Sequence, residues 1–62
     1  MNNSRPLAKE ILIEETNEGR GRIIELDGFY YAEAKKGKAW QLVLFSEFLQ
    51  VVRMALDHFL SE

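Results

Sequence analysis

The sequence predicts a small α+β domain, in which four antiparallel strands form a meander and one amphipathic helix follows at the C-terminus. Three observations lead to this fold class. Short segments rich in β-branched and aromatic residues alternate with polar stretches that contain glycine. The pair Asp27-Gly28 is a strong signal for a tight hairpin. After Ser46, apolar residues recur at the spacing of a helix instead.

The first two strands are expected at 7–15 and 22–27, with the polar turn TNEGRG between them. Residues 1–6 carry no periodicity and are interpreted as a loose leader. Glycine tolerates positive φ, so we interpret Gly19 and Gly21 as turn residues. They lack the longer glycine pattern of a phosphate loop, and no helix is expected to begin beside them.

The third and fourth strands are expected at 29–34 and 39–45, joined by the turn KKGK. Ala32 and Ala34 share one face of the third strand, which leaves room for a helix to pack there. The segment KAWQLVLFSEF also fits a helix that begins at Trp40, but we favour a strand followed by a helix. Strict alternation divides the apolar residues of the fourth strand between its faces, with Trp40, Leu42 and Leu44 against Val43 and Phe45.

Ser46 is expected to cap the C-terminal helix, and Glu47 in its first turn complements the helix dipole. The helix is expected to run about four turns. One helix covers only one face of a four-stranded sheet, so the remaining apolar surface favours a homodimer. The expected dimer-interface residues are Phe48, Val52, Leu56 and Phe59.

Composition narrows the classes of function. The chain has 62 residues, which is one domain at most, and a net charge of −2, which argues against nonspecific binding to DNA. It has no cysteine and no long apolar segment, so we expect a soluble protein of the cytoplasm or nucleoid, without contact to a membrane. We expect no enzyme, cofactor, metal or small-molecule substrate, since His58 is the only histidine. The acidic residues of the first strand, Glu10, Glu14 and Glu15, are interpreted as a solvated surface.

Five of the eight basic residues are expected to gather at one end of the sheet, because the turns after the first and third strands lie at the same end of a meander. Cations hold phosphates while aromatic rings stack on bases, a combination suited to single-stranded nucleic acid. The candidate phosphate-binding residues are Arg20, Arg22, Lys35, Lys36 and Lys38. The candidate base-stacking residues are Phe29, Tyr31 and Trp40.

The run KEILIEETNEGRGRIIEL and the later SEFLQVVRMALDHFL resemble a PUR repeat, the module of the purine-rich-element-binding proteins. Repeats of that family carry Arg-Gly-Arg in a polar turn, followed by an apolar pair, and later a helix that opens with Glu-Phe. The corresponding positions here are 20–22, 23–24 and 47–48, and the helix ends near the acidic-His-aromatic step at 57–59. The similarity spans residues 9–62.

This resemblance implies a strand meander with a helix, paired into an intertwined dimer that binds single-stranded DNA or RNA and acts in transcription regulation. Whirly proteins and related dimeric single-stranded-DNA-binding folds are near alternatives. In PUR repeats the turn before Arg-Gly-Arg holds a Lys and an Asn that contact nucleic acid, whereas Thr16 and Glu18 stand there in this chain. A dimerisation or protein-interaction module that has lost nucleic-acid binding is therefore the second hypothesis.

Overall fold

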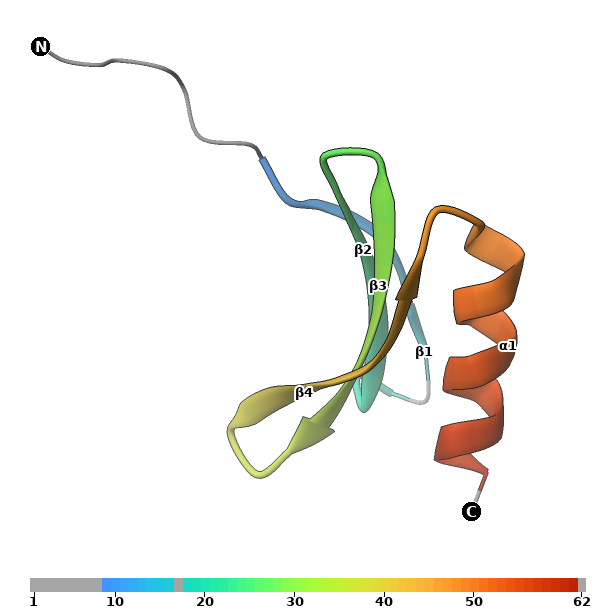
Figure 1. The fold of residues 1–62 in the computed structure, drawn as a ribbon. Helices are drawn as coiled ribbons and strands as arrows, with labels where there is room; N and C mark the ends of the chain where they lie inside the picture. Colours follow the sequence, from blue (N-terminus) through green and yellow to red (C-terminus); the bar gives the residue numbers. More distant parts are fainter. Residues whose placement is uncertain (1–8, 17, 62) are drawn as a thin grey trace, which may run out of the picture.

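The chain folds into one antiparallel sheet of order β1-β2-β3-β4 with a helix packed on one side of it, as Figure 1 shows. The computed structural model describes residues 9–16 and 18–61; the expected leader, the start of the first strand before Lys9 and the turn residue Asn17 lie outside them. The α+β fold class is thereby confirmed. The elements are β1 Ile11–Thr16, β2 Gly21–Leu26, β3 Phe29–Lys36, β4 Ala39–Ser46 and α1 Leu49–Leu60.

The turns form where glycine and aspartate were expected to place them, with one exception. Asp27 and Gly28 have φ of 58° and 89°, and positive φ at both central residues is the geometry of a type I′ hairpin. Gly19, with φ of 87°, closes the turn after β1. The interpretation of Gly21 as a turn residue is wrong, because it is the first residue of β2 and is buried. A Cβ atom there would lie 2.6 Å from Leu60 Cδ1, so the absence of a side chain at Gly21 lets Leu60 pack closely against β2.

The core lies between α1 and the sheet. Ile23 of β2 and Ala32 of β3 are fully buried together with Val52 and Leu56 of α1. The helix lies mainly over β3 and β4 and makes fewer contacts with β2. The small side chains of Ala32 and its neighbour Ala34, which is also buried, allow this approach, as expected.

The helix begins later than expected. Ser46 is the last residue of β4 rather than a helix cap, and its Oγ accepts a hydrogen bond from the backbone N–H of Phe48 at 3.1 Å. Phe48 is the N-cap residue, in an extended conformation and without a side-chain capping bond, so Glu47 precedes the helix and is not in its first turn. The helix has 12 residues, and no helix in the described part of the chain is long and apolar enough to cross a membrane.

A β-bulge in each edge strand interrupts the alternation of side chains. The β1–β2 register shifts between Leu12 and Glu14, and the β3–β4 register shifts so that Val43 has no partner in β3. The expected division of the fourth strand is therefore wrong: Leu44 pairs with buried Ala32, whereas Phe45 pairs with Tyr31. The extra residue in β4 puts Phe45 on the same face as Trp40 and Leu42, away from the helix.

Candidate nucleic-acid interface

The face of the sheet that α1 does not cover, called the open face below, carries two rows of side chains that each cross all four strands. One row is apolar and aromatic, and the next is mainly charged. The apolar row comprises Leu12, Ile24, Tyr31 and Phe45, with Leu26 and Phe29 beyond it. The charged row comprises Glu15, Arg22, Glu33 and Leu42, with Lys35 and Trp40 beyond it.

The aromatic rings of the open face contact one another. Tyr31 and Phe45 are stacked, with ring centres 5.5 Å apart, and Phe29 meets Phe45 edge-on at 6.0 Å. Phe45 is 53% exposed and Phe29 41%, which is unusual for side chains of this size. Sequence reasoning found Phe29 and Tyr31 but missed Phe45, because the bulge that turns it to this face has no glycine or proline to mark it.

Trp40 lies against two cations. The guanidinium carbon of Arg22 lies 4.1 Å from the centre of its ring, and Lys35 Nζ lies 5.0 Å from it. Both distances are within the range of cation–π attraction. Trp40 therefore holds Arg22 and Lys35 on the open face, and Tyr31, Phe45 and Phe29 form a separate group of contacting rings.

Arg22 is also paired with a carboxylate. Its Nε donates to Glu33 Oε1 at 2.7 Å, between neighbouring strands of the sheet. The two side chains are only 26% and 18% exposed, so water screens this pair less than it would screen a pair on a fully exposed surface.

The other expected phosphate-binding residues are placed around the same end of the sheet. The backbone N–H of Lys35 donates to the carbonyl oxygen of Arg20 at 2.8 Å, which places the two residues side by side. Lys36 pairs with Ala39, and strand alternation directs its side chain to the face opposite that of Lys35. Lys38 lies in the exposed turn between β3 and β4.

The residues expected at a dimer interface fall into two groups. Val52 and Leu56 are buried against the sheet of their own chain, so they belong to its core and offer no free surface. Phe48 and Phe59 are exposed, and sequence reasoning did not assign exposed Met54 to an interface. The helix therefore has an apolar outer surface of its own.

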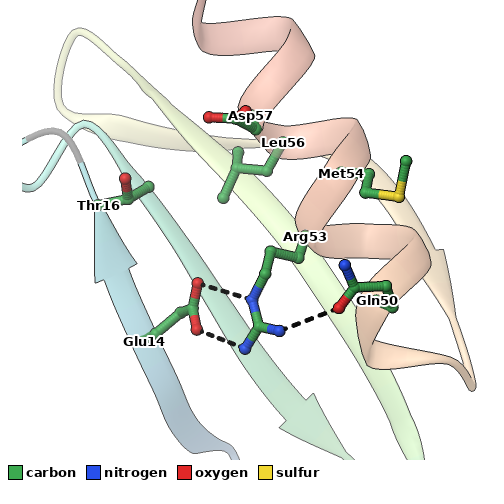
Figure 2. A pocket seen from close by; sticks show the side chains of 7 residues that line it. All are labelled: Glu14, Thr16, Gln50, Arg53, Met54, Leu56 and Asp57. Atoms are coloured by element: carbon green, nitrogen blue, oxygen red, sulfur yellow. Dashed lines mark hydrogen bonds and ion pairs between the residues drawn. The ribbon is translucent and has the colours of Figure 1, made fainter.

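A hollow of about 360 Å³ lies between β1 and α1, on the helix side of the sheet (Figure 2). Arg53 of α1 donates to both carboxylate oxygens of Glu14, at 2.8 and 3.3 Å, and to Gln50 Oε1 at 3.2 Å. The hydrogen bond from Arg53 holds the pKa of Glu14 below its ordinary value, against the opposing effect of partial burial. Glu14 in turn raises the pKa of Arg53.

The pair Glu14–Arg53 joins the helix to the edge strand. Each of the three guanidinium nitrogens of Arg53 donates to an acceptor within the chain. We therefore interpret these contacts as a structural link and do not assign a ligand to the hollow. Sequence reasoning placed Glu14 on a solvated surface and did not find this pair. The two residues are 39 positions apart, and only the bulge in β1 turns Glu14 toward the helix.

Comparison of the chain with protein-family models, with curated proteins and with solved structures found no match.

Proposed function

We propose that this chain binds single-stranded DNA or RNA on the open face of its sheet, as a homodimer and without catalysis. The observation that carries the proposal is the row of contacting rings, Phe29, Phe45 and Tyr31, beside the cations that Trp40 holds. The resemblance of residues 9–62 to a PUR repeat supports the same function.

The aromatic rings and the cations near them suit the two chemical parts of a single strand. Unpaired bases expose ring faces that stack on aromatic side chains, while the backbone phosphates need cations at a short distance. Tyr31, Phe45 and Phe29 take the bases in this proposal. Arg20, Arg22, Lys35 and Lys38 take the phosphates, and Trp40 positions two of them. Lys36 is not part of the proposed site, because its side chain points to the opposite face of the sheet.

A duplex fits this face less well. Its bases are stacked on each other and present only their edges, so the exposed rings would gain little from it. The chain is also acidic overall, with ten acidic residues against eight basic ones, so phosphate contacts alone would bind weakly. Stacking is therefore the part of the interaction that favours a single strand.

The test is a titration of a fluorescently labelled single strand of about 20 nucleotides, followed by anisotropy at about 50 mM salt. We expect binding that weakens steeply as salt is raised, and weaker binding by the double variant Arg20→Ala/Arg22→Ala. Lys9→Ala is the control, because Lys9 precedes β1 and lies at the end of the sheet opposite the β3–β4 turn. Absence of binding by the natural chain at this salt concentration would end the proposal.

The homodimer is proposed through the outer surface of α1. Phe48 and Met54 are 62% and 63% exposed there, and a second copy would remove them from water. Sedimentation equilibrium is expected to give twice the chain mass of 7.2 kDa, and Phe48→Asp is expected to give the monomer mass. A monomer mass for the natural chain at every concentration would contradict this part of the proposal.

The second candidate is a dimerisation or protein-interaction module without affinity for nucleic acid. The neutralisation of Arg22 by Glu33 favours it, because one of the cations of the open face is already paired. A dimer in sedimentation together with no binding of the single strand would identify this second function.

A further inference from the structure

Arg22 is engaged by Glu33 on only one of its donor groups. Nε donates to Glu33 Oε1 at 2.7 Å, and within the described residues the two terminal nitrogens of Arg22 make no other hydrogen bond or ion pair. Those nitrogens are the donors that bind phosphate in a forked geometry. Arg22 therefore has free donors for a phosphate, but the carboxylate of Glu33 neutralises much of its positive charge.

The orientation of Arg22 does not depend on that carboxylate alone. The guanidinium lies on the Trp40 ring at 4.1 Å, and the ring keeps it on the open face. A neutral amide oxygen at position 33 would accept the same hydrogen bond from Nε. Replacing Glu33 by glutamine therefore removes the negative charge and keeps an oxygen that can hold Arg22.

We propose that Glu33 is a built-in competitor of phosphate at Arg22, so that its charge sets how tightly the open face holds a nucleic-acid strand; this inference rests on the proposed function. A phosphate that reaches Arg22 also comes close to Glu33, and the two negative charges repel each other across a partly buried site. While Glu33 neutralises Arg22, this arginine neutralises no phosphate, so it releases no condensed cation from the strand and contributes nothing to the salt dependence of binding.

The experiment compares the natural chain with Glu33→Gln, which removes the charge and keeps the acceptor oxygen. We expect the variant to bind a labelled oligothymidylate of about 20 nucleotides about three- to tenfold more tightly at about 50 mM salt. The slope of log K against log salt should also steepen by about 0.7, the value for one more phosphate neutralised on a single strand. If the only role of Glu33 is to hold Arg22 in place, Glu33→Gln will show neither the tighter binding nor the steeper slope.

Two further variants separate competition at Arg22 from a general change in charge. Glu47→Gln removes one negative charge from the exposed link between β4 and α1, and is expected to change the affinity by less than about twofold. In the Arg22→Ala background, Glu33→Gln is expected to give less than half of its gain in log K, because the phosphate site is then absent. An equal gain with and without Arg22 would overturn the inference.

The outcomes distinguish this inference from the function on which it rests. If the natural chain binds, Arg22→Ala weakens binding and Glu33→Gln leaves it unchanged or weaker, the competitor role is wrong while the function stands. If neither the natural chain nor Glu33→Gln binds at about 50 mM salt, both the competitor role and the proposed function are wrong. If only Glu33→Gln binds, the competitor role is supported, and the natural chain is the interaction module of the second hypothesis.

Discussion

Phe45 stacks on Tyr31 on the open face of the sheet, with ring centres 5.5 Å apart and ring planes 19° apart. The contact exists because the bulge in β4 adds one residue that has no partner in β3, which makes Phe45 and Tyr31 register partners. A bulge beside a candidate binding surface is a common way for a strand to redirect a side chain.

Phe45 therefore provides a test of base stacking that leaves the charges unchanged. Phe45→Leu keeps an apolar side chain but removes the ring, and we expect it to weaken binding of a single strand at least about fivefold. Phe45→Tyr keeps the ring and should stay within about twofold of the natural chain. Anisotropy titration measures both, and equal affinities for the two variants would show that stacking at this position contributes nothing.

Gly21 is expected to resist substitution although its backbone is that of an ordinary strand. The Cβ of Gly21→Ala would lie 2.6 Å from Leu60 Cδ1 and 3.0 Å from Thr16 Cγ2, so the Leu60 side chain must move out of its packed position. We expect a loss of about 1–2 kcal/mol in the free energy of unfolding, measured by urea denaturation. In the Leu60→Ala background the same substitution should cost less, since the contacted methyl group is gone; an unchanged cost would show that the helix does not press on this residue.

Leu56 is expected to be essential for folding rather than for association. It is 2% exposed, and Leu56→Ala should cost about 2–5 kcal/mol, which is comparable with the whole stability of a domain of this size. Circular dichroism should show a largely unfolded chain at every protein concentration. Asp57→Ala, at the next position and exposed, should change the stability by less than about 0.5 kcal/mol. Equal stabilities for the two variants would contradict this assignment of the core.

The order of the elements could be predicted from the sequence because its causes are local. Asp27-Gly28 accepts positive φ at both positions, and this is enough to join two strands in a hairpin. The helix follows from the spacing of its apolar residues, and Ala32 and Ala34 show where it packs. These signals lie within a few residues of the structure that they determine.

The details of the candidate site could not be predicted, because their causes are distant in the sequence or have no marker. The bulge at Val43 decides on which face Phe45 lies, and no turn residue marks it. Ser46 has the chemistry of a helix cap, yet the chain stays extended through Phe48 before the helix begins. Arg22 meets Glu33 only after β2 and β3 have paired, so the neutralised cation becomes visible only in the folded chain.

The ion pair between Glu14 and Arg53 predicts how stability depends on pH. The pKa of Glu14 is lowered in the folded chain, chiefly by the hydrogen bond from Arg53, so the pair stabilises the fold above the unfolded glutamate pKa of about 4.3. This contribution is lost as the pH falls through the lower folded value. Glu14→Gln should therefore lower the urea midpoint at about pH 7. This gap, the difference in urea midpoint between the natural chain and the variant, should close toward about pH 2. Glu15→Gln, on the opposite face of β1 and exposed, is the control and should show a smaller gap at about pH 7. A gap for Glu14→Gln that stays constant over this range would show that Arg53 does not favour the charged form of Glu14.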